Sequence, residues 1–241
     1  MSQPQPGARE MPLTAPSQTL APIDAEALRT RSRADFVYES LRDAIWDGRI
    51  AVGERIREEE IARNLGVSRT PVREALHRLR QRGLLAFGAG RGLTVASLSQ
   101  HQLLQLYAMR EILEGSAARF AAQHATAPEI ALLWRLQKEL CKAEHDATTL
   151  VTLNRRLHQA IYEAAHNEYL LQTLSVLHDS FALLNSTTFR VPTRRPESDE
   201  EHRQIVAAIE ERNPDRAEDM AREHIRQAQR TRFESAAIGI R

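Results

Sequence analysis

Three of the nine histidines occupy positions from which their rings could bind one metal ion together. His158 follows Asn154 by one helical turn, and both flank an apolar stripe, while His202 and His224 continue the apolar faces of two other predicted helices. Neutral imidazoles are ligands for Zn, Ni, Cu, Fe or Co, and Mn is also possible. Three inward rings and the Asn154 carbonyl could therefore form a divalent metal site. Three separate, hydrogen-bonded histidines are the alternative, because spacing across three helices does not establish that the rings converge.

Arg110 is a candidate for binding an anion, because its helical position aims the guanidinium at the protein interior. Leu103, Leu106 and Leu113 lie on the same face, seven and four residues before it and three residues after it. A buried charge needs a partner. The carboxylate of a bound ligand and the side chain of Glu114, four residues further on, are the two alternatives, and the sequence leaves both open. A metal ion beside an arginine would favour a small organic acid, such as a sugar acid or a hydroxy acid.

An open metal site can also activate water, so a metal-dependent enzyme is a further alternative. The sequence places no general base, nucleophile elbow or phosphate-binding loop near the histidines. We therefore do not expect an enzyme.

Arginines within residues 31–98 form a second group of side chains that could bind a partner. This segment holds 13 basic residues, all of them arginine, and 9 acidic residues. Between Arg69 and Arg91 there are six arginines and one acid, Glu74. Arginine suits bidentate contacts with phosphate and guanine, so this charge density predicts salt-dependent binding of nucleic acid. A solvated basic helix is the alternative.

The elements that carry these arginines are predicted to form a helix-turn-helix. The apolar spacing indicates a first helix that ends at Asp47-Gly48, a second over Glu58–Leu65 and a third over Arg69–Arg82. Gly66 makes the turn, and Ser68 is expected to cap the third helix. The third helix of such a motif enters the major groove of double-stranded DNA.

A β-hairpin is predicted after the third helix. The runs Leu84–Phe87 and Leu93–Ala96 are joined by the glycine-rich residues 88–92, which suits a turn with a flexible basic tip. The candidate DNA contacts are Arg69 and Arg73 near the start of the third helix, and Arg91 and Gly92 at the hairpin tip.

Residues from Ser99 onward show only helical periodicity. Six helical segments are predicted, over 99–124, 127–145, 147–165, 167–189, 198–212 and 214–236, with a loop from Val191 to Pro196. Segments of this length with short connections indicate a mostly antiparallel bundle. The fold class is therefore mainly α: an N-terminal winged helix-turn-helix followed by an all-α antiparallel helical bundle. The expected divisions are a disordered N-terminal tail over 1–30, the DNA-binding domain over 31–97, the helical domain over 98–236 and a C-terminal tail over 237–241.

Composition excludes several classes of protein. Cys141 is the only cysteine among 241 residues, so an intrachain disulfide is impossible and a reducing compartment is expected. No apolar run approaches the roughly 18 residues of a membrane span, and the first residues contain no hydrophobic signal segment. Five of the ten prolines lie in residues 1–22, which favours disorder there. We expect a soluble, cytoplasmic protein with no membrane partner.

The third helix and the hairpin carry a recognisable pattern. The run from Gly66 to Leu76, followed by Leu79, Gly83-Leu84 and Arg91-Gly92, closely resembles the winged-helix signature of the GntR family of bacterial transcription regulators over about 65 residues. The resemblance implies DNA contacts from Arg57 (or Arg55, to phosphate), Ser68, Arg69, Thr70, Arg73, Arg91 and Gly92. Some relatives carry a basic DNA-contacting residue at position 59, where this chain has Glu59, so that contact is not carried over.

The helical bundle is similar to the FCD effector domain of GntR regulators of the FadR type, especially its metal-containing branch. The similarity spans about 140 residues and runs through Arg110 with Glu114, Asn154 with His158, the Glu201-His202 pair, and His224. It implies a divalent ion, Zn, Ni or Mn, bound by Asn154, His158, His202 and His224. It also implies a small carboxylate effector bound by Arg110 and Glu114.

Asn154 departs from this pattern, because many relatives have Asp at the corresponding position. An amide carbonyl is a neutral ligand, so a divalent ion bound by it and three imidazoles keeps a charge of +2 instead of +1. We expect weaker metal retention and stronger attraction for an anionic ligand.

These features together predict a ligand-responsive transcription regulator. The resemblance implies a homodimer, and a two-fold protein implies a pseudo-palindromic operator in double-stranded DNA. Repression released by the effector is the expected sign of control. An architectural DNA-binding protein without effector control is the remaining alternative.

Overall fold

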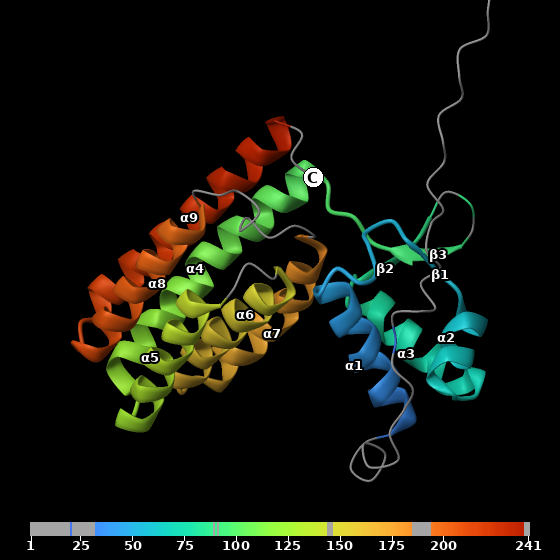
Figure 1. The fold of residues 1–241 in the computed structure, drawn as a ribbon, viewed down its shortest axis with the longest axis horizontal. Coiled ribbons are helices and arrows are strands. Elements are labelled where there is room, and N and C mark those ends of the chain that lie inside the picture. The colour runs from blue at the N-terminus through green and yellow to red at the C-terminus, as the bar shows by residue number, and fades with distance from the viewer. Residues whose placement is uncertain are drawn as a thin grey trace, which may run out of the picture.

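The computed structural model describes residues 20, 32–88, 90, 92–143, 147–184 and 194–238, which form two halves that lie side by side (Figure 1). The N-terminal half contains α1 (Arg33–Trp46), β1 (Arg55–Ile56), α2 (Glu58–Leu65), α3 (Arg69–Gln81), β2 (Leu85–Phe87) and β3 (Leu93–Val95). The C-terminal half contains α4 (Gln100–His124), α5 (Ala127–Lys142), α6 (Ala147–Ala164), α7 (Glu168–Phe181), α8 (Arg194–Glu210) and α9 (Pro214–Ile238). The predicted fold class is confirmed: a winged helix-turn-helix followed by a helical bundle.

The three helices of the N-terminal half end where the sequence supplies caps and glycines. The Ser32 hydroxyl accepts a hydrogen bond from the backbone N–H of Asp35 at the start of α1. Gly66 adopts a φ of +67° between α2 and α3, a conformation that favours glycine. Apolar side chains on the inner faces, such as Val37, Leu41 and Leu79, are at most 1% exposed and form one core.

The small sheet has β3 at its centre, with the order β1-β3-β2 and both pairs antiparallel. The predicted hairpin is confirmed, since Leu85 pairs with Val95 and Phe87 with Leu93. The sequence analysis missed β1, because a strand of two residues is too short to give a periodic pattern. Arg91, predicted at the hairpin tip, lies outside the described residues.

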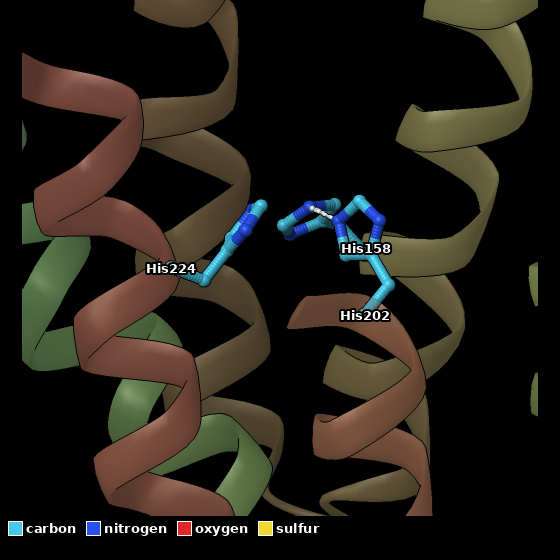
Figure 2. A group of neighbouring side chains, drawn as sticks. All are labelled: His158, His202 and His224. Atoms are coloured by element: carbon cyan, nitrogen blue, oxygen red, sulfur yellow. Dashed lines mark hydrogen bonds between the residues drawn. The ribbon is translucent and has the colours of Figure 1, made fainter. Parts of the chain in front are cut away.

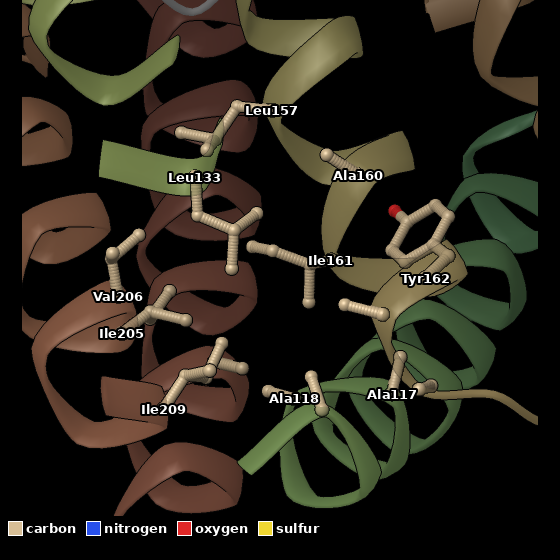
Figure 3. Close-up of a cluster of buried hydrophobic side chains, with 14 of the residues drawn as sticks. Ala117, Ala118, Leu133, Leu157, Ala160, Ile161, Tyr162, Ile205, Val206 and Ile209 are labelled. Atoms are coloured by element: carbon tan, nitrogen blue, oxygen red, sulfur yellow. The ribbon is translucent and has the colours of Figure 1, made fainter. Parts of the chain in front are cut away.

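The C-terminal half packs its long helices around a second apolar core (Figure 3). Leu133, Leu157 and Val206, from three different helices, are completely buried there. Small side chains on α4, such as Ala117 and Ala118, are also fully buried. A capping box starts α4: the Ser99 hydroxyl accepts from the backbone N–H of Gln102, whose side chain accepts from the Ser99 N–H.

The six predicted helical segments correspond to α4 to α9, and the largest differences lie at the start of α8 and the end of α7. The predicted loop from Val191 to Pro196 is wrong over Arg194–Pro196, because α8 begins at Arg194. Pro196 is the third residue of α8, where the absent N–H would have had no acceptor within the helix. The segment predicted over 167–189 stops being α-helical at Phe181, and residues 185–193 lie outside the described part of the chain.

A short 3-10 helix, η3 (Ala182–Leu184), follows α7 and packs into the N-terminal half. Ala182 and Leu183 are 3% and 5% exposed and belong to the apolar core of the N-terminal half. Polar contacts surround this junction: Arg82 Nη1 lies 3.6 Å from Asp179 Oδ2, and Arg155 Nη1 lies 3.5 Å from Asp43 Oδ1. The end of α7 is therefore anchored in the half that contains α3.

The segment predicted as a disordered tail contains one described residue, Leu20, which is 7% exposed and packs in the N-terminal core. The rest of that tail, up to residue 30, lies outside the described residues. Of the predicted C-terminal tail, residues 237 and 238 extend α9. Among the helices described, none is long and apolar enough to cross a membrane.

Candidate functional site

Three histidine rings from three helices point toward one another in the C-terminal half (Figure 2). His158 comes from α6, His202 from α8 and His224 from α9, and one ring nitrogen of each lies within 4.8 Å of the others. The side chains are buried, with 7%, 1% and 5% exposed. The structure thus brings together the three histidines that the sequence analysis selected. They are not three separate side chains, which was the alternative.

Two carboxylates orient the outer rings of this histidine triad. Glu114 Oε2 lies 2.8 Å from Nδ1 of His158, and Glu201 Oε2 lies 2.6 Å from Nδ1 of His224. A neutral imidazole has one N–H, and a carboxylate accepts it at Nδ1. The lone pair of Nε2 in each outer ring therefore points away from the carboxylate. Nε2 of His158 lies 3.2 Å from Nε2 of His202, within hydrogen-bond distance, and a metal ion at the triad would replace this bond (Figure 2). Second partners of this kind typically fix the orientation of metal-binding histidines.

Each of these carboxylates is in turn paired with an arginine. Arg110 Nε donates to Glu114 at 2.7 Å, and Arg194 donates to both oxygens of Glu201 at 2.6 and 2.7 Å. Two chains, Arg110–Glu114–His158 and Arg194–Glu201–His224, therefore flank His202. The two arginines balance the two glutamates in charge, so the charged groups of the two chains sum to zero.

Arg194 is a site residue that the sequence analysis missed. Its side chain is 1% exposed, although it lies at the start of α8 in a segment predicted as a loop. The role of Glu201 as the partner of His224 was also not assigned. Helical spacing could not have related Glu201 to Arg194, because the helix was predicted to begin only at residue 198.

The electrostatic environment keeps His202 and His224 neutral. Burial, together with the neighbouring rings and Arg194, holds the pKa of both His202 and His224 well below the ordinary histidine value. Burial alone would raise the pKa of Glu114, but Arg110 and His158 outweigh it and hold that pKa well below its usual range. Neutral imidazoles beside ionised carboxylates are the protonation states that a metal site requires.

Asn154 supplies a test of whether the site fits a metal ion. It lies one turn before His158 on α6, and its Oδ1 is buried without a hydrogen-bond partner among the described residues. An unpaired buried carbonyl is costly unless a ligand or an ion satisfies it. Nδ1 of His202 is similarly buried without a partner among those residues. The donor set of three imidazole nitrogens and one amide oxygen fits a divalent transition metal.

The partner of Arg110 within the protein is Glu114, which was one of the two alternatives predicted for it. The Arg110 guanidinium also lies over two aromatic rings, 4.5 Å from the centroid of Phe181 and 5.2 Å from that of Tyr107. Its hydrogen bond within the described residues uses only Nε. The terminal amino groups are thus the part of Arg110 that a second anion would contact.

The predicted DNA contacts of the N-terminal half lie on α3 and beside α2. Arg57, Arg69 and Arg73 are exposed, with 60%, 56% and 65% of their side chains accessible. Each pairs with a glutamate of the first turn of α2: Arg57 with Glu60 at 2.8 Å, Arg69 with Glu59 at 2.7 Å and Arg73 with Glu58 at 2.9 Å. The sequence analysis did not foresee these pairs.

The remaining predicted contacts surround the same helix. Ser68 is at the N-cap of α3 with extended backbone, but its side chain makes no capping hydrogen bond, and it is exposed, as is Thr70. A Cβ atom at Gly92 would lie 2.8 Å from Nε of Arg55, so glycine lets the Arg55 side chain pass the hairpin. Arg55 is thereby placed next to the hairpin.

Two family models match the two halves. Residues 33–95 match "Bacterial regulatory proteins, gntR family", and residues 105–227 match "FCD domain". The chain is 31% identical over 222 residues to the Glc operon transcriptional activator of Escherichia coli (strain K12), covering 81% of this chain and 87% of that protein. It is 33% identical over 207 residues to a probable D-xylose utilization operon transcriptional repressor of Paenarthrobacter nicotinovorans, covering 83% and 90%.

Solved structures agree on the fold. E. coli McbR/YncC has a TM-score of 0.77 at 23% identity, and the match covers 86% of this chain and 99% of that one. A GntR regulator from Rhodococcus sp. RHA1, described as a putative transcriptional regulator, has a TM-score of 0.74 at 23% identity, covering 85% and 99%. The matched families and relatives are transcription regulators and not enzymes. The chain therefore belongs to the GntR family of bacterial transcription regulators, with a DNA-binding winged helix-turn-helix and an FCD domain of the FadR type.

Proposed function

We propose that this regulator binds a divalent metal ion at the histidine triad, and that a small organic acid bound beside the ion controls its affinity for DNA. The observation that carries the proposal is the convergence of three buried imidazole rings, two of which are oriented by carboxylates. Such an arrangement costs stability without an ion, because it buries unpaired polar atoms. Zn, Ni and Mn are the candidate metals.

His158, His202, His224 and Asn154 would hold the ion. When bound, it would supply a positive centre with open positions for the carboxylate or hydroxyl oxygens of the effector. Because all four donors are neutral, the full charge of +2 would remain available to an anion. A small carboxylate, such as a hydroxy acid or a sugar acid, suits this site.

Arg110 would bind the effector carboxylate through its terminal amino groups, while its Nε–H continues to donate a hydrogen bond to Glu114. Arg110 is connected to the triad through Glu114 and His158, so an effector on the ion would be near it. A carboxylate at Arg110 forms a charge-assisted hydrogen bond, which is strong when shielded from water. Arg110 and Glu114 thus act together, Glu114 as a positioning residue.

The contacts of Arg110 suggest how the signal reaches DNA. Its guanidinium lies over Phe181, the last residue of α7, and η3 follows directly and packs in the N-terminal core. On the same helix, Asp179 lies 3.6 Å from Arg82, which caps the C-terminus of α3. An effector that moves Arg110 would therefore shift the anchor of the DNA-binding half. Control requires only that the effector bind the two arrangements with different affinity.

A homodimer on a pseudo-palindromic operator is the proposed DNA-binding form. Exposed apolar side chains lie on two helices that pack against each other, α4 and α7. Leu104, Met109 and Ile112 on α4 are 42–47% exposed, and Tyr169 and Val176 on α7 are 84% and 56% exposed. Apolar surface of this kind favours a protein interface, and a second copy of the chain is its proposed occupant. We propose repression that the effector releases, in the cytoplasm.

Metal analysis followed by thermal unfolding tests the sensing half. Protein purified without added metal should contain about one divalent ion per chain, and His202→Leu should not. Glycolate, malate and gluconate are suitable first probes, and stabilisation by one of them should disappear on chelation. Equal metal content in wild type and His202→Leu would refute the proposed site.

Arg73→Ala tests the DNA half separately. We expect loss of binding to an operator duplex with unchanged stabilisation by the organic acid, because α3 and the triad lie in different halves. Unchanged binding to the operator would show that Arg73 is not a DNA contact.

A further inference from the structure

The ion pairs of the DNA-facing arginines carry an inference about specificity, which rests on the DNA-binding face proposed above. Three consecutive glutamates, Glu58, Glu59 and Glu60, form the first turn of α2, and each pairs with a different arginine. Glu59 is the most exposed of the three, at 63%, and it reaches Arg69 at the first position of α3. A carboxylate is thereby placed at the tip of the predicted recognition helix.

Helix stability explains part of this acidic turn. Negative side chains in a first turn interact favourably with the helix dipole, and α2 lacks a side-chain cap at Arg57. This effect requires acids near the start of α2, but it does not require Glu59 to contact another helix. An exposed ion pair of this kind contributes little to folding. Folding stability therefore does not explain the contact between Glu59 and Arg69, and a functional role is the remaining explanation.

We propose that Glu59 is a specificity-determining residue, which makes Arg69 a poor partner for phosphates and leaves it free for a base edge. Glu59 occupies one terminal amino group, Nη2, of the Arg69 guanidinium. A guanidinium has five N–H donors, so others remain for O6 and N7 of guanine, which carry no net charge.

A phosphate is a different partner, because it brings a negative charge close to the Glu59 carboxylate. The two anions repel each other, so a phosphate contact from Arg69 is weakened while a guanine contact is not. Phosphate contacts supply nearly all of the affinity for DNA of arbitrary sequence. Glu59 would thus lower binding to arbitrary DNA more than binding to the operator, and so raise the ratio between them.

Glu59→Gln in the full-length protein tests this proposal, with Glu74→Gln as the matched control. Glu74 is an exposed glutamate on α3 for which the described residues show no ion pair, so its replacement removes the same charge nearby. The probes are a duplex selected from random DNA by the wild-type protein and a mixed-sequence duplex of equal length. Both dissociation constants are measured over a range of salt concentrations.

We expect Glu59→Gln to bind the mixed-sequence duplex about three- to five-fold more tightly, as estimated for removing one repulsive charge at a wet surface. Its plot of log K against log salt should steepen by about 0.9 for each additional phosphate that the variant binds. Binding to the selected duplex should change less, so the specificity ratio falls. Glu74→Gln should leave the ratio unchanged.

An unchanged ratio in Glu59→Gln, or an equal fall in Glu74→Gln, would overturn the proposal. Thermal unfolding of each variant shows whether it folds. If Glu59→Gln does not fold, the test is repeated with Glu59→Ala. Arg69→Ala separates this proposal from the one on which it rests. If Arg69→Ala binds the selected duplex like wild type, the DNA face itself is wrong. If it loses binding while the ratio in Glu59→Gln is unchanged, only the role of Glu59 fails.

Discussion

Acidification should destabilise the metal-free protein through the buried histidines. In the unfolded chain, His202 and His224 bind protons near the ordinary pKa of 6.5, but in the folded protein burial keeps their pKa well below that value. The unfolded state therefore binds more protons as the pH falls below about 6.5. Stability from these two groups is complete above this pH and is lost progressively below it.

The size of the loss follows from proton linkage. At pH 5.5, one unit below the unfolded pKa, each ring that stays neutral in the folded state lowers the unfolding free energy by about 1.4 kcal/mol. The two rings together therefore account for about 3 kcal/mol between pH 7.5 and 5.5. This is a large share of the stability of an ordinary domain, about 5–15 kcal/mol.

Urea unfolding after chelation measures this effect in the C-terminal half. Trp134 lies beside the C-terminal core, and a Trp46→Phe background leaves it as the only tryptophan. In His202→Gln the loss between pH 7.5 and 5.5 should be smaller by about 1.4 kcal/mol, because one titrating ring is gone. His77→Asn, which replaces an exposed histidine on α3, should behave like its parent. An equal loss in His202→Gln and its parent would contradict the assignment of His202 as a neutral buried ring.

Three further predictions concern the site, its coupling and the junction. Asn154→Asp should retain metal longer in dialysis and bind carboxylates more weakly, because the charge of the ion and its ligands falls from +2 to +1; equal metal retention would argue against Asn154 as a ligand. Phe181→Ala should preserve stabilisation by the organic acid but reduce the change in operator affinity that the acid causes, whereas Ser175→Ala, at an exposed site on the same helix whose hydroxyl bonds to the backbone of α7, should leave that coupling intact. Ser99→Ala should lower the unfolding free energy by about 1 kcal/mol through loss of the capping box, measured by urea unfolding against Ser116→Ala, whose hydroxyl bonds only within α4.

Much of the fold was predictable because local patterns and caps agree with the tertiary structure. Gly66, Ser68 and the apolar spacing of α3 specify a helix-turn-helix without long-range information. The beginning of α8 was not predictable in this way, because Pro192 and Pro196 indicate a loop. A proline is compatible with the first turn of a helix as well as with a loop. Only the burial of Arg194, which the sequence does not show, distinguishes a helix from a loop here.

The candidate site was predictable only in part. His158, His202 and His224 were found because each continues an apolar stripe on its own helix. The two Arg–Glu–His chains were not found, because Glu114 and His158 are 44 residues apart and their contact depends on how α4 packs on α6. The pairs between Glu59 and Arg69 and between Glu58 and Arg73 likewise connect different helices, and no periodic pattern encodes them.

The insertion of η3 into the N-terminal core limits how the protein can be divided or recombined. Leu183 fills space among side chains of a half that ends, in sequence, nearly ninety residues earlier. A fragment cut after the hairpin would expose an apolar socket to water and would tend to aggregate. A biosensor that fuses this C-terminal half to a different DNA-binding domain would need a matching apolar pocket for η3 in that domain. Without it, effector binding would not be coupled to DNA affinity.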